Sequence, residues 1–245
     1  MKKVVTIVAA CLFAAYLLFA LFVSRSGEDK AKTEVCNGVV VDVRNKSGYD
    51  LMHNSTVNDI LAAQGMHPYG KTMGEIDIEA MEQVLKSSPL IYTANCYKTN
   101  ANEVFVSLVT KVPILRVINN KGEDFYLDSN SDIIDAKLQP LDIPLATGNI
   151  DKQYASEKLY DLALLIRSSD FWNAQIAQIN VTAENQVTLV PRVGNHLLML
   201  GEASDFENKL ERLMKFYEDG LSVIGWNKYS SISVAFNNQV VCKKK

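Results

Sequence analysis

Few residues of this chain have the types and spacing that catalysis requires. Only three histidines occur among the 245 residues, and they lie in separate segments, at His53, His67 and His196. An isolated imidazole is more often a packed or surface group than a base or a ligand. The chain also lacks a G-x-S-x-G elbow, an S-x-x-K pair, a phosphate-binding loop, a dinucleotide-binding glycine pattern and an H-E-x-x-H motif. We therefore predict no catalytic residue and no cofactor, and expect that the protein is not an enzyme.

One acidic segment, residues 128–132 with the sequence DSNSD, matches the first half of a calcium-binding loop. In such a loop, oxygen ligands at alternating positions point at the ion. Here, however, the sixth position is Ile133, where a sharp turn requires glycine, and the twelfth is Gln139, where a bidentate glutamate is needed. The segment is therefore predicted to be a polar turn between strands, and no metal site is expected.

The cysteines suggest a structural hypothesis instead of a chemical one. The chain has four of them and no C-x-x-C pair, so a zinc site is not indicated. Cys36 and Cys96 fall at the start of the first strand and the end of the second strand predicted below. If these strands lie outside the cytoplasm, both thiols are in an oxidising compartment. Two alternatives stay open for this pair, a disulfide bond or two buried free thiols.

The elements that position these residues follow an apolar N-terminal segment. Residues 4–23 read VVTIVAACLFAAYLLFALFV, in which only Thr6 is polar. Twenty residues at about 1.5 Å per residue span about 30 Å, the thickness of the hydrocarbon core of a bilayer. A cleaved signal peptide is disfavoured because no small-residue cleavage site ends the run. Residues 8–11 resemble a lipoprotein cleavage box, but the apolar run continues for 12 residues beyond Cys11. A core helix is disfavoured by the charged flanks, so we predict one transmembrane helix.

The flanking charges predict the orientation of this helix. Lys2 and Lys3 precede it, and a domain of over 200 residues follows it. Because long domains translocate largely regardless of charge, the short basic side is predicted to be cytoplasmic and the bulk periplasmic. Removing these two lysines from the 25 basic residues leaves 23 against 28 acidic ones, a net charge of −5. Such an acidic domain is poorly suited to binding the phosphate backbone of a nucleic acid, so no nucleic-acid partner is expected.

The patterning of the exported part predicts an α+β fold. A β-branched strand at 39–43, two helices and strands at 91–97 and 103–110 form a β-α-α-β-β unit. Asp77 is a predicted N-cap for the second helix, and Ser204 with Glu207 is a predicted capping box farther along. After residue 111 the pattern changes to short strands and turns, which predicts an extended antiparallel sheet with flanking helices. The predicted parts are the cytoplasmic tail, membrane helix, linker, β-α-α-β-β unit, β-rich domain and basic tail, at residues 1–3, 4–23, 24–34, 35–111, 112–241 and 242–245.

This layout and several short motifs resemble the bacterial cell-division family FtsQ, also called DivIB. The resemblance is sharpest at residues 111–117, KVPILRV, where the first predicted unit ends and the second begins. Further matches are FYLD at 125–128, PRVG at 191–194 and the closing strand that ends at Val240 and Val241. The sequence departs from the family in having no glycine within residues 129–132 and no proline soon afterward. These departures indicate a locally rebuilt turn.

The resemblance implies a role as well as a fold. The β-α-α-β-β unit would be a POTRA domain, a docking module, and the protein a non-enzymatic scaffold of the divisome. It would lie in the inner membrane at the division septum. Its membrane-distal domain would bind the ectodomains of proteins resembling FtsB and FtsL, and its POTRA domain would assist recruitment.

The closing strand, residues 229–236, is the predicted binding site. A terminal strand at a sheet edge exposes unpaired main-chain groups, and a partner strand can satisfy them. Alternation predicts that Ile232, Val234 and Phe236 point inward, with Ser231, Ser233 and Ala235 outward. Ser233→Pro is expected to remove an edge donor or a ladder bond and to block partner pairing. The candidate partner-binding residues are Trp226, Lys228, Tyr229, Ser231, Ser233, Ala235 and Phe236.

Two other functions remain as alternatives. A membrane-anchored periplasmic enzyme would need a cleft with two carboxylates close together, and no motif points to such a pair. A POTRA-containing adaptor of an assembly or secretion system would usually carry a large barrel or several POTRA units in tandem. This chain shows neither. The scaffold hypothesis is therefore preferred.

Overall fold

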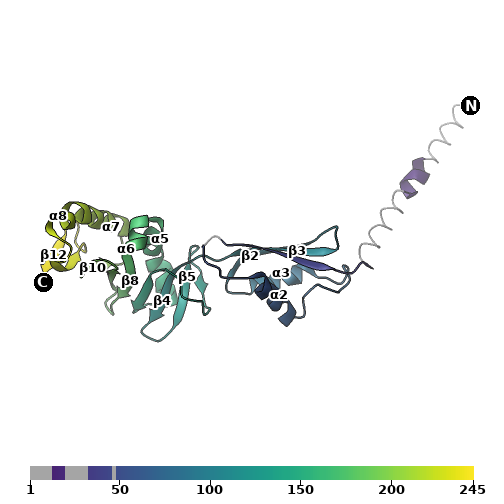
Figure 1. Ribbon diagram of the computed structural model, residues 1–245, viewed down its shortest axis with the longest axis horizontal. Helices are drawn as coiled ribbons and strands as arrows, with labels where there is room; N and C mark the ends of the chain where they lie inside the picture. Colours follow the sequence, from purple (N-terminus) through teal and green to yellow (C-terminus); the bar gives the residue numbers. More distant parts are fainter. Residues whose placement is uncertain (1–12, 20–32, 46–47) are drawn as a thin grey trace, which may run out of the picture. The chain divides into compact units, whose positions relative to one another are not determined.

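The computed structural model describes residues 13–19, 33–45 and 48–245 (Figure 1). Most of the predicted membrane helix, residues 4–23, lies outside the described residues; the described part, residues 13–19, is helical. Within these described ranges, no helix has both the length and the apolar character that crossing a membrane requires. The chain forms two compact units. One comprises the described residues up to Arg44 together with Met52–Thr110. The other comprises Lys111–Lys245 together with the described residues of Asn45–Leu51, and each unit is described by itself.

The first unit is a three-stranded sheet covered on one face by two helices (Figure 1). The predicted β-α-α-β-β order is confirmed. The central strand β3 pairs in parallel with β1 and antiparallel with β2. The elements are β1 (Gly38–Arg44), α2 (Asn54–Ala63), α3 (Ile78–Lys86), β2 (Ile91–Lys98) and β3 (Glu103–Thr110).

Local sequence explains the helix α3. The Asp77 carboxylate accepts a hydrogen bond from the Ala80 N–H at 2.9 Å, which confirms the predicted cap. Met81 and Leu85 then lie one turn apart on the buried face, where they pack with Val106 of β3 in one hydrophobic core. The helix is thus fixed by its cap at one end and by its apolar stripe along one side.

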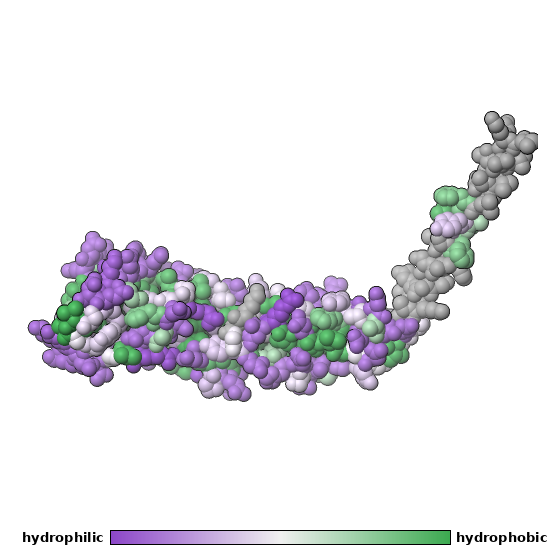
Figure 2. Space-filling model, turned by 45° about the horizontal axis from the view of Figure 1, so that its top comes forward, coloured by the Kyte–Doolittle hydropathy of each residue, from purple (hydrophilic) through white to green (hydrophobic). Residues whose placement is uncertain are grey.

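Among the described residues, no helix covers the opposite face of this sheet. Val40, Phe105 and Tyr97 form one row across β1, β3 and β2. The rings of Phe105 and Tyr97 stack with their centroids 5.0 Å apart. Val40 and Tyr97 remain 41% and 51% exposed. Figure 2 shows hydrophobic residues, in green, gathered on the surface of this unit.

The disulfide alternative for Cys36 and Cys96 is wrong in this structure, where both thiols are free and buried. Cys96 of β2 lies opposite Val106 of the central strand, and Val106 lies opposite Val41 of β1. Cys36 precedes β1, which is the strand at the opposite edge of the sheet from β2. Two strand spacings are about 9.6 Å, whereas a disulfide needs Cα atoms within about 7 Å. The intervening strand therefore keeps the thiols apart, and Cys36 donates to the Gly38 carbonyl oxygen instead.

The second unit is built on a nine-stranded sheet in the order β12-β11-β10-β9-β8-β7-β4-β5-β6. In chain order, its strands are β4 (Pro113–Asn119), β5 (Asp124–Asp128), β6 (Ile133–Ile134), β7 (Leu145–Gly148), β8 (Ile176–Val181), β9 (Gln186–Pro191), β10 (Leu197–Glu202), β11 (Tyr229–Ser233) and β12 (Val241–Lys244). The sheet is mixed, so the predicted antiparallel sheet is wrong. β4 with β7, β7 with β8, and β10 with β11 are parallel pairs.

Helical crossovers explain two of the parallel pairs, because parallel neighbours need a long connection between them. The connection from β7 to β8 contains α4 (Lys152–Tyr154), the π-helix η1 (Ala155–Leu159), α5 (Tyr160–Ser168) and α6 (Asp170–Gln175). The connection from β10 to β11 contains α7 (Phe206–Lys215), the π-helix η2 (Phe216–Leu221) and α8 (Ser222–Ile224). These helices lie along one side of the sheet (Figure 1) and bury Leu162, Ile166 and Leu213 against it.

A predicted turn and a predicted helix cap have different outcomes. The acidic segment is a polar turn, as predicted, in which the Asp128 carboxylate accepts from the Asn130 and Asp132 N–H groups at 2.8 Å each. The capping box is wrong. α7 begins at Phe206, and its N-cap is Asp205, a left-handed residue with φ +53° that makes no side-chain cap. A turn between Ser204 and Glu202 delays the start of the helix.

Candidate partner-binding surface

The predicted binding strand is not at the edge of the sheet. β11 lies between β10 and β12, so the edge is β12. The chain reverses at Asn237 and Asn238, of which Asn238 is left-handed with φ +60°, and it returns antiparallel to β11. Residues 242–245, predicted to be a solvated tail, therefore mostly belong to β12. An alternating pattern predicts one buried face, but it does not tell whether a strand has one neighbour or two.

Main-chain directions identify which groups of β12 are open. The Val234 N–H donates to the Met199 oxygen of β10 at 3.0 Å. Because successive residues of a strand direct their main-chain groups to alternate sides, Ser233 points the other way, toward its partner Val241. By the same alternation, Cys242 directs its N–H and C=O groups away from β11, whereas the Lys244 oxygen accepts a hydrogen bond from the Ser230 hydroxyl of β11 at 3.4 Å. We call this outward side of β12 the open edge.

This geometry also changes the expected effect of Ser233→Pro. Ser233 pairs with Val241 inside the sheet. A proline there would break the ladder between β11 and β12 and so disrupt the fold, whereas the sequence alone predicts a blocked edge. The residue that tests the edge must lie on β12.

The side chains next to the open edge form two transverse rows on the face away from the helices. The first row is Leu197, Ser231 and Lys243, and the second is Met199, Ser233 and Val241. Leu197, Met199 and Val241 are between 43% and 47% exposed. Ile232 and Val234 are fully buried on the other face, which confirms the predicted alternation there. The predicted inward position of Phe236 is wrong, because β11 ends at Ser233 and the alternation stops there, so that Ala235 and Phe236 are both exposed.

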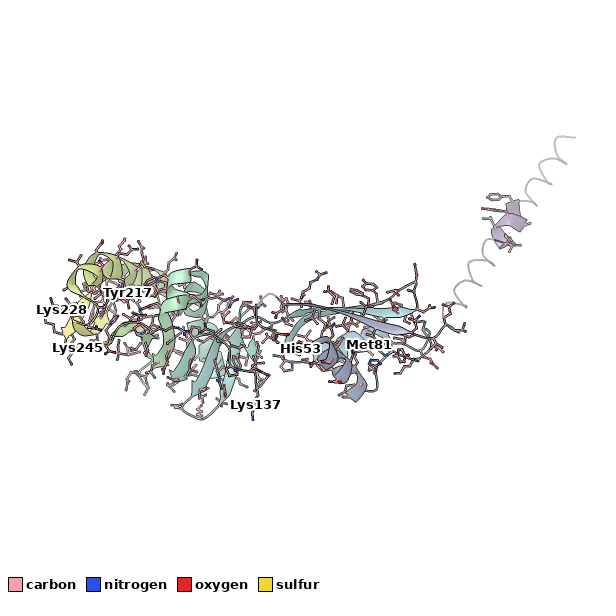
Figure 3. All side chains as sticks on the ribbon, in the orientation of Figure 1. His53, Met81, Lys137, Tyr217, Lys228 and Lys245 are labelled. Carbon is pink, nitrogen blue, oxygen red and sulfur yellow. The ribbon has the colours of Figure 1, made fainter. Side chains whose placement is uncertain are left out.

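Lysines surround the open edge. The Lys245 N–H donates to the Lys228 oxygen, which holds the two residues together at the end of the unit (Figure 3). Lys243 and Lys244 are adjacent on β12 and exposed. Within the part of the chain that the structure describes, none of these four lysines forms an ion pair. The edge is therefore basic although the chain as a whole has a net charge of −3.

An aromatic cluster supports the segment that leads into β11. The ring of Trp226 meets the ring of Tyr217 edge-on, with centroids 5.2 Å apart, and Tyr217 in turn meets Trp172 at 5.7 Å. Trp226 is 37% exposed, so it both packs on this cluster and borders the surface. The sequence did not reveal the cluster because its members come from α6, η2 and the loop before β11.

A buried polar pair completes the cluster. His196 Nε2 lies 2.8 Å from the Tyr217 hydroxyl oxygen. Burial lowers the pKa of His196 and raises the pKa of Tyr217 to about 12. Both groups are therefore neutral near pH 7. The pair is therefore a neutral hydrogen-bonded contact within the aromatic cluster that includes Trp226.

Comparison with known proteins agrees with this architecture. A family model described as FtsQ/DivIB, C-terminal related, matches residues 112–243. A model of the POTRA-like domain matches residues 34–109. No curated protein matches the chain. Because the first match covers more than half of the 245 residues and runs from β4 into β12, the chain belongs to the FtsQ/DivIB family.

Proposed function

We propose that this protein is a non-enzymatic scaffold of the division machinery. The family match supports the cell-division role. The apolar run at residues 4–23, preceded by two lysines, supports a single-pass anchor in the inner membrane with a cytoplasmic N-terminus. The remaining residues would then lie in the periplasm at the septum and couple the recruitment of early and late division proteins.

The observation that carries the proposal is the open edge of β12. Unpaired N–H and C=O groups on an edge strand can hydrogen-bond to an added strand. We propose that the ectodomain of a partner resembling FtsB, together with one resembling FtsL, supplies that strand. The main-chain groups of Cys242 would pair with it, and the surrounding lysines would favour a segment that carries acidic side chains. Lysines also discourage pairing between copies of the same edge, which suits a strand that must stay open.

The test is a proline placed on the open edge. Cys242→Pro removes an outward N–H and places a ring there without breaking the ladder to β11. The full chain in phosphatidylcholine nanodiscs would be titrated with the partner ectodomains by biolayer interferometry. We expect the dissociation constant to rise by about tenfold or more, since a lost hydrogen bond and a blocked strand together exceed about 1.4 kcal/mol.

Cys242→Ala is the matched control, because it removes the same partly buried side chain but keeps the N–H. This variant should bind as the wild type does. Equal affinity of Cys242→Pro and Cys242→Ala, with both folded by circular dichroism, would show that the partner does not add a strand to β12.

A further inference from the structure

The second unit carries a groove on its helical side, and the open edge contributes no residue to it. One cavity, of about 650 Å³, lies between η1–α5 and the start of α7. A cavity of about 320 Å³ adjoins it and shares Lys158 and Ala203 as walls. A third cavity of about 260 Å³ continues from the second through shared Tyr154 and Asn185. Through these shared residues the three cavities adjoin one another beside the helical segment from Tyr154 to Ser168, and we call them together the groove.

The floor of the main cavity is apolar and half-covered. Leu164 and Leu165 of α5 line it, and both are only partly buried. Phe206, the first residue of α7, lines it from the other helix. Cavities of this size, with an apolar floor and a few polar groups, are typical of ligand or peptide sites.

The rim of the groove is acidic. Glu157 and Asp161 lie one helical turn apart on the same wall, and both are exposed. Asp205 and Glu207 line the opposite wall, and Glu184 and Glu202 line the adjoining cavity. Lys158 is the one basic residue among the described linings of these two cavities. None of the six carboxylates forms an ion pair within the described ranges.

The walls of the main cavity also limit the secondary structure of an occupant. α5 and α7 satisfy their main-chain groups internally along most of their length, and no strand edge faces this cavity. An added strand would therefore have no strand edge with which to form main-chain hydrogen bonds in this cavity. A helix satisfies its own main chain and needs only apolar anchors at i, i+4 and i+7.

We propose that this acidic groove docks an amphipathic helix from a partner protein, with leucine-type anchors on the floor and Arg or Lys side chains against the rim. This would be a second docking surface besides the open edge, and its charge requirement is the opposite one. A partner segment suited to β12 is acidic, and a segment suited to the groove is basic. The two surfaces therefore select different segments.

The test uses a synthetic helical peptide with Leu at i, i+4 and i+7 and Arg at the flanking positions, labelled for fluorescence anisotropy. It would be titrated into the full chain in phosphatidylcholine nanodiscs, with empty nanodiscs as the blank. Glu157→Lys/Asp161→Lys should weaken binding about tenfold, because each reversed charge replaces an attraction by a repulsion. Raising the salt concentration should weaken binding to the wild type as well.

Glu218→Lys/Asp219→Lys is the matched control. It makes the same charge change at two exposed residues of η2 that do not line the groove. It should bind within about twofold of the wild type. Equal losses in both variants would mean general attraction to an acidic protein and would overturn the proposal. So would an unchanged affinity when the three leucines of the peptide are replaced by serine.

Two further outcomes are informative. If the groove variant does not fold, Glu157→Gln/Asp161→Asn keeps the shape and should weaken binding about threefold. Self-association of the wild type that the groove variant abolishes, without peptide binding, would assign the groove to the basic edge of a second copy and overturn the proposal. Because the Cys242 variants are measured separately, failure here leaves strand addition at β12 untouched.

Discussion

At the scale of single residues, burial determines the chemistry of the few groups that could react. Cys36 and Cys96 lie inside the core of the first unit, and burial raises the pKa of Cys96 to about 11. Since the thiolate is the reactive form of cysteine, Cys96 is unreactive near neutral pH. The sequence predicted that these cysteines are structural or bonded, but only the strand order shows why they remain apart.

His196 provides a prediction at the same scale. Burial lowers its pKa in the folded state below the unfolded value of about 6.5. The unfolded chain therefore binds the proton more readily. The free energy of unfolding should be unaffected above about pH 6.5 and should fall as the pH drops through the folded-state pKa. Thermal unfolding of the wild type and His196→Phe, measured from pH 7.5 down to about pH 5, should show a steeper loss for the wild type.

Parallel pH profiles for the wild type and His196→Phe would contradict the assignment. His196→Phe should also be less stable at pH 7.5 by about 1 kcal/mol, because the Tyr217 hydroxyl loses its partner.

At the scale of elements, local sequence predicted the existence of most helices and strands but not all of their ends. Asp77 and Ser204 look alike in sequence, since each precedes an apolar helical stripe. Only Asp77 caps its helix, because the chain before α7 turns at Glu202 and places Asp205 in a left-handed conformation. For β11, likewise, the pattern predicted a strand but not its place in the sheet. Residues 241–244 pair along its outer side, so β11 is an inner strand and not the edge.

These two caps yield a paired prediction. Asp77→Ala should lower the free energy of unfolding by about 1 kcal/mol, because the Ala80 N–H loses its acceptor. Ser204→Ala should change it by less than about 0.5 kcal/mol, as for an ordinary surface substitution. Urea unfolding followed by circular dichroism measures both. A larger effect at Ser204 than at Asp77 would contradict the helix boundaries described above.

At the scale of the whole molecule, the sequence predicted the α+β class and the order of elements but not the pairing of the larger sheet. Its pattern records which face of a strand is buried, whereas parallel pairing depends on crossovers that return the chain in the same direction. The open edge and the acidic groove were both missed for this reason. Each is assembled from segments far apart in the sequence, such as Lys228 with Lys245 and Asp161 with Glu207.

The division role is tested in cells. Depletion of the protein should produce filaments that grow without dividing, and expression of the Cys242→Ala variant should restore division, because the N–H at the open edge remains. Expression of Cys242→Pro at the same level should restore it poorly. Depleted cells that divide normally would contradict the scaffold proposal and favour the adaptor or enzyme alternatives.

The parallel pairing of β10 with β11 has a consequence for the order of folding. The two strands are separated by the whole α7–α8 crossover, so their contact closes a long loop and is expected to form late. Until it forms, β10 is the last strand of the sheet and exposes unpaired main chain beside Leu197 and Met199. An edge of that kind can pair with other chains and aggregate. The β11–β12 hairpin would therefore act during folding as a cover that replaces an apolar edge with a basic one.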